Sequence, residues 1–314
     1  MTSYERVLTT LRHEEPDRVP YNLRPSPEMR AILQAQTGQT DFDAWFGCDV
    51  RYVGIGLPPC PAGVVPQEWT PRPTDAQVEQ ARQEADRQRA AGFAVCSAYE
   101  CGIFEQAKHW IGDEATMIGP YVNPGPFAQL LDRITEWKME LYGAYVRAGV
   151  DIVWIGDDLG TQRSLVMSPQ QYREWYRPRH QCLVDHLRRL RPDVYIAFHC
   201  CGHVTPLIPD LIAIGIDILE AVQAETMDLA ALKREFGRDL CFWGAVGAQS
   251  VLARTTPEEV QAGVRRTLAI MAPGGGYIAA PCHTLTEEVP WESVVAFREA
   301  MQRYGAYPNG WAGS

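Results

Sequence analysis

The chain of 314 residues is long for one ordinary domain and normal for a single α/β barrel. Its 46% hydrophobic and 22% charged residues are typical of a globular protein with a full core, and the net charge of −10 argues against a general nucleic-acid binder. No apolar run approaches the roughly 20 residues that span a bilayer, and residues 1–6 open as a helix without a signal peptide, so we expect a cytoplasmic protein that binds neither nucleic acid nor membrane.

The first half of the chain alternates predicted helices with short apolar strands. Thr2 and Glu5 form a capping box before a helix that runs to about residue 12, and Ser26 with Pro27 starts a second helix. Residues 56–74 read as loop, and residues 99–122 as irregular or partly helical. We expect strands at residues 19–23, 49–53, 93–98 and 151–155, and longer helices at about 75–91 and 126–148.

The second half continues the alternation. Ser168 and Thr256 are predicted helix caps, each followed by proline, and Gly274-Gly275-Gly276 is expected to stop a helix in a tight turn. Strands are predicted at residues 195–199, 216–220, 240–243 and 277–280.

Eight buried strands that alternate with helices indicate a parallel sheet covered by helices. We found no G-x-G-x-x-G motif after the first strand, which argues against a dinucleotide-binding fold. The sequence therefore predicts a single α/β domain over residues 1–314, a (β/α)8 TIM barrel with an N-terminal helical extension.

Chemistry in such a barrel lies at the carboxyl ends of the strands, so these positions were compared with one another. Asp157 and Asp158 are expected to contact substrate there, together with Tyr99, although a loop-capping role for the aspartates stays open. The ligand-type residues that recur at strand ends are Tyr99-Glu100-Cys101, Asp157-Asp158, His199-Cys200-Cys201, Glu220 and Pro281-Cys282-His283.

A metal site is predicted at the end of the fifth strand. Side chains alternate along a strand, so His199 and Cys201 share a face and can both bind one zinc ion, which takes imidazole and thiolate ligands. Cys282 is a natural third ligand, but His283 competes with it, because one residue of register decides which side chain points inward. Glu220 could be the fourth ligand or leave that place to substrate. A thiolate-rich zinc site suits alkyl transfer to or from sulfur.

The nine cysteines do not form a disulfide framework, and free thiols or metal ligands are expected in a reducing cytoplasm. Cys200 faces away from His199 and is predicted to lie in the core. Four further cysteines have no partner by spacing and are interpreted as structural, namely Cys48, Cys60, Cys182 and Cys241.

Several motifs, taken together, resemble the uroporphyrinogen decarboxylase-like superfamily over nearly the full length of the chain. The resemblance implies a (β/α)8 barrel, in agreement with the strand count. The motifs that carry it are Glu15-Pro16-Asp17-Arg18-Val19-Pro20, Gly156-Asp157-Asp158-Leu159-Gly160, Met167-Ser168-Pro169, Phe198-His199-Cys200-Cys201-Gly202, Phe236-Gly237, Thr256-Pro257-Glu258-Glu259-Val260 and Gly275-Gly276-Tyr277-Ile278-Ala279-Ala280-Pro281-Cys282-His283.

The superfamily includes two chemistries. Metal-free decarboxylases grip porphyrinogen carboxylates with an N-terminal arginine-containing motif, of which only Arg24 corresponds here. Zinc-dependent methyltransferases, which move methyl groups between corrinoid proteins and coenzyme M, carry a His-x-Cys pair and a later Cys, similar to His199, Cys201 and Cys282. The related cobalamin-independent methionine synthase adds a glutamate placed like Glu220. The chain departs from these relatives in having His283 directly after the last cysteine.

The resemblance implies a zinc-dependent methyltransferase that moves a methyl group between a small methylated substrate or a corrinoid protein and a thiol or corrinoid acceptor. The cofactor would be zinc, with a corrinoid carried by a partner protein, and the question of a homodimer stays open. The alternative is a metal-free decarboxylase of a carboxylated, porphyrinogen-like substrate, in which Arg24, Asp157 and His283 handle carboxylates. A non-catalytic corrinoid or zinc carrier is a third interpretation.

Overall fold

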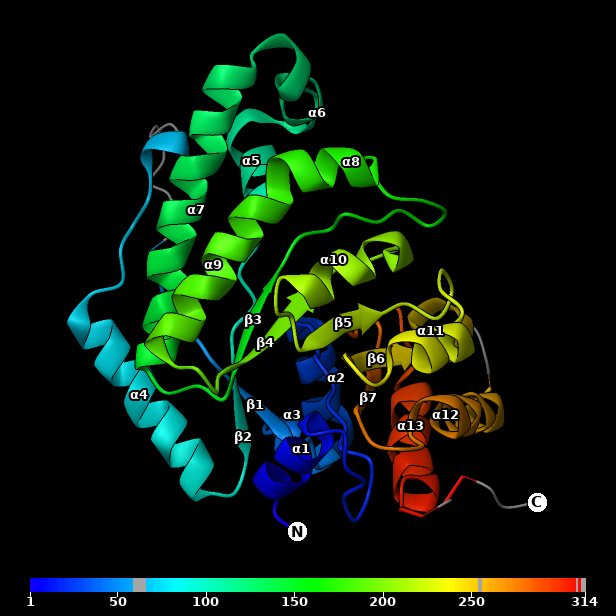
Figure 1. The fold of residues 1–314 in the computed structure, drawn as a ribbon. Coiled ribbons are helices and arrows are strands. Elements are labelled where there is room, and N and C mark those ends of the chain that lie inside the picture. The colour runs from blue at the N-terminus through cyan, green and yellow to red at the C-terminus, as the bar shows by residue number, and fades with distance from the viewer. Residues whose placement is uncertain (59–65, 254–255, 309, 312–314) are drawn as a thin grey trace.

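A computed structural model describes residues 1–58, 66–253, 256–308 and 310–311. Its centre is a parallel sheet of seven strands, each paired with the next along the chain, which curls into most of a ring (Figure 1). The strands are β1 (Val50–Val53), β2 (Ala94–Ser97), β3 (Ile152–Gly156), β4 (Tyr195–His199), β5 (Ile218–Val222), β6 (Cys241–Val246) and β7 (Tyr277–Pro281).

Helices cover the outside of this sheet, as expected for strands that are buried on both faces. The helices are α1 (Ser3–Leu11), α2 (Pro27–Thr37), α3 (Phe42–Phe46), α4 (Asp75–Ala90), α5 (Ile103–Ile111), α6 (Asp113–Val122), α7 (Pro124–Arg147), α8 (Pro169–Gln171), α9 (Arg177–Leu190), α10 (Ile208–Ala213), α11 (Leu229–Phe236), α12 (Pro257–Met271) and α13 (Trp291–Tyr304).

The capping signals read from the sequence are confirmed. The side chains of Thr2, Ser168 and Thr256 each accept a hydrogen bond from the backbone of the third helical residue in a full capping box, and Ser26 caps α2. Of the two alternatives for residues 99–122, irregular or partly helical, the structure has the helical one, with α5 and α6. The helix after Ser168 is interrupted by a π-helical turn at Tyr172–Tyr176.

Two layers of side chains alternate along the strands. On β3, Val153 and Ile155 face the helices, whereas Trp154 faces the inside of the ring. Trp154 stacks there on Trp243, with ring centroids 6.1 Å apart. Helix α1 covers the amino-terminal end of this interior. Its Val7 and Leu11 pack there against the inward-facing side chains of the strands.

The prediction of eight strands was wrong at residues 19–23. In place of a strand, Tyr21 makes one isolated bridge to Ala279 on β7. The main-chain carbonyl of Tyr21 also accepts from Asp49, just before β1, so the segment links the two edges of the sheet. Pro20 has no N–H to donate, and the Tyr21 N–H donates to the Asp49 side chain at 2.9 Å, which removes the donors that a longer ladder needs.

The glycine run at residues 274–276 forms the predicted tight turn, since all three residues have positive φ. A Cβ on Gly275 would lie 2.4 Å from the carbonyl oxygen of Glu14, so the close approach of the N-terminal segment also requires glycine there.

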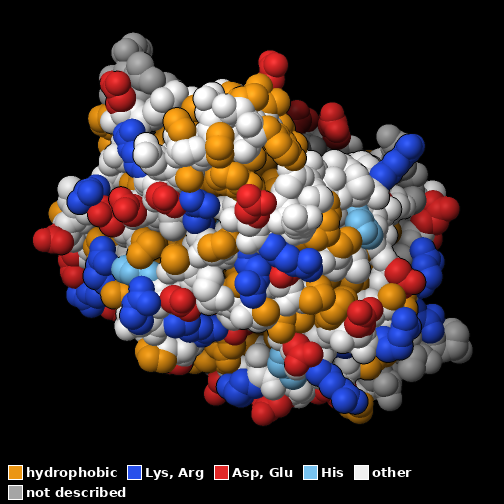
Figure 2. Space-filling model, turned by 45° about the horizontal axis from the view of Figure 1, so that its top comes forward, with side chains coloured by type: hydrophobic (Ala, Val, Ile, Leu, Met, Phe, Trp, Pro, Cys, Tyr) orange, Lys and Arg blue, Asp and Glu red, His pale blue; other side chains and the backbone are white. Residues whose placement is uncertain are grey.

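Apolar side chains gather on part of the upper face of the molecule (Figure 2). The exposed large apolar residues of α6 are Met117, Ile118, Tyr121 and Val122. Within the described residues, no helix combines the length and the apolar character that a membrane crossing requires.

Candidate metal centre

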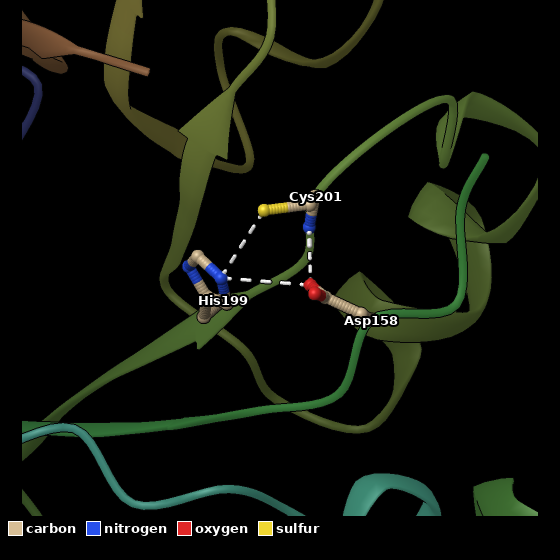
Figure 3. Close-up of side chains that lie close together, drawn as sticks. All are labelled: Asp158, His199 and Cys201. Carbon is tan, nitrogen blue, oxygen red and sulfur yellow. Dashed lines mark hydrogen bonds and ion pairs between the residues drawn. The ribbon is translucent and has the colours of Figure 1, made fainter. Parts of the chain in front are cut away.

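Three potential ligands meet beyond the ends of β3 and β4 (Figure 3). His199 ends β4, Cys201 follows two residues later, and Asp158 comes from the loop after β3. The Nε2 atom of His199 lies 3.5 Å from the Cys201 Sγ and 3.5 Å from the Asp158 Oδ1. A tetrahedral zinc ion with bonds of about 2.0–2.3 Å separates its ligand atoms by roughly 3.5 Å, so the spacing and the donor types fit zinc.

The backbone holds this arrangement by close packing of two strand ends. The Cys201 N–H donates to the Asp158 Oδ1 at 2.7 Å. A Cβ on Gly160 would lie 2.5 Å from the carbonyl oxygen of Cys201, and one on Gly202 would lie 2.6 Å from the carbonyl carbon of Gly160. The glycines of the two loops therefore let the chains that carry Asp158 and Cys201 touch.

Glu220 lies behind His199. Strand register pairs the two residues on β4 and β5, and the Glu220 carboxylate accepts a hydrogen bond from His199 Nδ1. Burial acts to lower the pKa of His199, but the Glu220 charge and hydrogen bonds to Cys201 and Glu220 raise it to about 10. Such a carboxylate fixes the imidazole and leaves its other nitrogen for a metal. Glu220 therefore contacts the far nitrogen of His199 and lies outside the cluster of Asp158, His199 and Cys201, whereas the sequence suggested that it could be a fourth ligand or leave that place to substrate.

Cys282 and His283 reach the same cavity from the end of β7. This cavity, about 450 Å³, is also lined by Asp158 and Cys201. Cys282 is only 4% exposed, and its sulfur lies outside the cluster of Asp158, His199 and Cys201. Burial and the nearby charge of Glu225 hold the pKa of the Cys282 thiol well above its ordinary value. His283 is exposed on the wall of the cavity.

Tyr99 packs against the centre without lining the cavity. Its ring meets that of His199 edge to face at 4.8 Å, and its hydroxyl donates to Glu105. Burial raises the pKa of Glu105 to about 7, against the hydrogen bond from Tyr99 and with the help of the charges of Asp157 and Asp158. No sequence pattern marks Glu105, because its contact with Tyr99 depends on how α5 folds over the strand ends.

Asp157 faces away from this cavity and is fully buried. Its carboxylate accepts from the backbone N–H groups of Ile103 and Glu105, both at 2.9 Å, and lies 2.9 Å from Nε2 of His180. Helix α5 has Gly102 at its N-cap, which has no side chain, so Asp157 supplies the missing capping oxygens. The loop-capping interpretation of Asp157 thus agrees with its placement.

The sequence predicts core or structural roles for five further cysteines. Cys200 is buried as predicted, with its sulfur accepting from the Leu159 N–H at 3.3 Å, and Cys48 and Cys241 are buried too. Cys182 is exposed on α9, so it is not a core residue. Cys60 lies outside the described residues.

The chain is similar to several known proteins in fold and in sequence. The chain superimposes on a solved methyltransferase from Methanosarcina mazei with a TM-score of 0.74, at 19% identity, covering 96% of this chain and 98% of that one. The sequence is 25% identical over 180 residues to the methylcobamide:CoM methyltransferase MtaA of Methanosarcina barkeri, covering 57% of this chain and 50% of that protein.

It is also 26% identical over 207 residues to a uroporphyrinogen decarboxylase of Geobacter sulfurreducens, covering 63% of this chain and 54% of that protein. The matches thus span about half the length of these curated relatives. The profile of the uroporphyrinogen decarboxylase (URO-D) family matches residues 104–304. This match confirms the resemblance read from the sequence motifs, and the chain belongs to the uroporphyrinogen decarboxylase (URO-D) family.

Proposed function

We propose that the protein is a zinc-dependent methyltransferase that moves a methyl group between a small methylated compound or a corrinoid protein and a thiol or corrinoid acceptor. The observation that carries the proposal is the meeting of His199, Cys201 and Asp158, with Cys282 on the wall of the same cavity. Two sulfur ligands beside an imidazole form a donor set that zinc prefers.

In this proposal His199, Cys201 and Cys282 hold the zinc ion, and Asp158 either takes the fourth place or yields it to substrate. Bound zinc supplies Lewis-acid activation, which keeps a substrate thiol in its nucleophilic thiolate form near neutral pH. Glu220 orients the His199 ring, and Asp158 fixes the backbone at Cys201 through its hydrogen bond. The Ala248 N–H, 3.2 Å from the Cys282 sulfur, favours negative charge on that sulfur.

Arg24 supports a substrate that carries an anionic group. Its Nε donates to the Thr284 hydroxyl at 2.9 Å, and its guanidinium lies 4.7 Å from the centroid of a Trp154 ring. It lines a small interior space together with Glu220 and His283. Among the ion pairs formed by the described residues, none engages Arg24, so this cation remains available to a carboxylate or sulfonate.

The name of one relative, a methylcobamide:CoM methyltransferase, supports a corrinoid as methyl donor or acceptor. The similar identity to a uroporphyrinogen decarboxylase supports the second candidate, a metal-free decarboxylase in which Arg24 and His283 contact substrate carboxylates. The two functions differ in their need for metal.

The deciding experiment is the metal content of protein purified without chelator, for the wild type, Cys282→Ala and Cys182→Ala. We expect about one zinc per chain in the wild type and in Cys182→Ala, whose cysteine is exposed on α9 and does not line the cavity, and loss of zinc in Cys282→Ala. The zinc-loaded protein should then demethylate methylcobalamin in the presence of a thiol. Wild-type protein that binds no zinc yet decarboxylates a carboxylated substrate would establish the second candidate instead.

A further inference from the structure

Glu225 joins the loop after β5 to the wall of the cavity. One carboxylate oxygen, Oε1, accepts from the Ser250 N–H at 3.0 Å, the Ser250 hydroxyl at 2.8 Å and the Gln249 N–H at 3.2 Å. The other oxygen, Oε2, accepts from the Cys282 sulfur at 3.5 Å. A single side chain therefore connects one candidate zinc ligand to the turn that follows β6.

That turn is a π-helical segment at Ala248–Leu252. A Cβ on Gly247 would lie 2.6 Å from Oε1 of Glu225, so glycine at this position lets the carboxylate reach the first N–H groups of the turn. The Ala248 N–H, held by the same turn, donates to the Cys282 sulfur at 3.2 Å. π-Helical turns are rare and occur frequently at functional sites.

In the metal-free protein Glu225 thus holds the Cys282 thiol directly, through its S–H, and also through the turn that it fixes, whose Ala248 N–H contacts the sulfur; only this second contact persists when the sulfur is a thiolate. The Cys282 backbone is fixed separately, because its N–H donates to the Val246 carbonyl at 2.9 Å as part of the β6–β7 edge. With the backbone fixed, the side-chain rotamer of Cys282 decides where its sulfur lies relative to His199 and Cys201.

We propose that Glu225 is a positioning residue of the metal centre, which sets the place from which the Cys282 sulfur joins His199 and Cys201 on the metal. The inference rests on the proposed function, because it takes these three residues as ligands. Groups that orient metal ligands in this way commonly change metal affinity by about 10–100-fold when they are replaced.

Cobalt(II) binding tests the proposal without an activity assay, since each thiolate bound to cobalt adds intensity to a sulfur-to-metal absorption band. Affinity is measured by competition with a chromophoric chelator for the wild type, Glu225→Ala, Glu225→Gln and Glu235→Ala, the last being an exposed glutamate on α11. We expect Glu225→Ala to bind cobalt about 10–100-fold more weakly with a diminished thiolate band. Glu225→Gln keeps an oxygen for the turn and an amide beside the sulfur, so it should resemble the wild type, as should Glu235→Ala.

Wild-type affinity and spectrum in Glu225→Ala would overturn the proposal, and so would a Glu225→Gln variant as weak as Glu225→Ala, because charge and not position would then matter. If Glu225→Ala does not fold, Ser250→Ala removes one hydrogen bond to the carboxylate and should change the spectrum in the same direction; an unchanged spectrum there counts against the proposal. Loss of the thiolate band in Cys282→Ala, with no effect at Glu225, would leave the proposed function standing and reject this inference alone.

Discussion

Two histidine–cysteine pairs lie at opposite ends of the ring of strands and have similar geometry. His199 and Cys201 are at the carboxyl end of β4, whereas Cys241 begins β6 and faces His13 at the amino-terminal end. In both pairs the Nε2 and Sγ atoms are 3.5 Å apart. In both, the other ring nitrogen contacts an oxygen, which is the Glu220 carboxylate in one case and the Gly237 carbonyl, at 3.2 Å, in the other.

The pairs differ in what surrounds the sulfur. Cys201 lies on a cavity and has Asp158 within ligand distance, but the Cys241 sulfur is buried beside the carbonyls of Thr10 and Leu11. Strands end and loops open at the carboxyl end of the sheet, so only there can further ligands and a substrate approach. A histidine near a cysteine therefore indicates a metal site only where a third ligand and an open space accompany the pair.

The largest difference between the two pairs is expected when the cysteine of each is replaced by alanine. Cys201→Ala should reduce the zinc content from about one per chain to a trace, because the ion loses a thiolate ligand. Cys241→Ala should keep full zinc content. Elemental analysis of both variants gives the answer, and zinc loss in Cys241→Ala would show that the amino-terminal pair also binds metal.

The second contrast concerns the group behind each histidine. Glu220→Gln should weaken zinc binding by about 10–100-fold, because the carboxylate that fixes His199 becomes a neutral amide. His13→Ala provides the matched control at the other pair and should leave zinc affinity unchanged. Affinities from chelator competition test both, and equal affinities in wild type and Glu220→Gln would remove Glu220 from the centre.

Zinc affinity at the His199 pair is also expected to depend on pH. Zinc must displace a proton from His199, whose pKa in the metal-free protein is about 10, so affinity should rise by about tenfold or more per pH unit from pH 7 toward 10. A variant with His199→Gln should lose the part of this dependence that comes from one proton, about tenfold per pH unit, and keep the part that comes from the cysteine thiols. A zinc affinity of the wild type that does not change with pH would contradict the prediction that His199 loses a proton when zinc binds.

The same pKa has a consequence for folding of the metal-free protein. The pKa of His199 is raised in the folded state above the ordinary value of 6.5, so protonation stabilises the fold fully below that pH, and the stabilisation is lost as pH rises through about 10. The difference in free energy of unfolding between wild type and His199→Gln should therefore shrink between pH 6 and 10, as denaturant titrations can measure. A difference that stays constant would exclude this linkage.

Replacing Cys241, the cysteine that pairs with His13, should have only a small effect on the free energy of unfolding. Cys241→Ala removes a sulfur that is 1% exposed, and the lost packing should lower the free energy of unfolding by about 1 kcal/mol. Denaturant unfolding of zinc-free wild type and variant isolates this packing effect from metal binding. A loss several times larger would assign the pair a greater structural role than its contacts suggest.

Much of the candidate site could be predicted from alternation and strand order. His199 and Cys201 share a face because side chains on a strand alternate, and Cys282 lines the same cavity because the ends of parallel strands meet at one edge. The contact between Glu220 and His199 follows from neighbouring strands in register. These relations follow from the regular geometry of strands, and the positions of strands can be predicted from the sequence.

What could not be predicted depends on loops. Asp157 and Asp158 are adjacent in sequence, yet one caps α5 and the other joins the metal cluster, and only the fold of residues 99–122 decides between them. Glu225 lies in a loop beyond β5, where neither periodicity nor strand position applies. The missing strand at residues 19–23 depends on the side chain of Asp49, which is far along the chain.

Neighbouring strands of the ring are joined by unequal numbers of residue pairs. Five residue pairs join β6 to β7, but one bridge joins Tyr21 to β7, and one pair, Cys96 with Ile152, joins β2 to β3. The N-terminal quarter of the ring, from residue 20 to residue 97, is therefore joined to the neighbouring strand on each side by a single residue pair.

This quarter supplies Arg24 and Tyr52 to the interior, and it precedes the residues that the family profile matches. The metal cluster and Cys282 stand on the other strands, which are joined by longer ladders. Substitutions in this quarter can thus alter groups that line the interior while the candidate metal ligands keep their places. The ring of strands thus keeps the residues that line its interior near Arg24 apart from the candidate metal ligands at the ends of β3, β4 and β7.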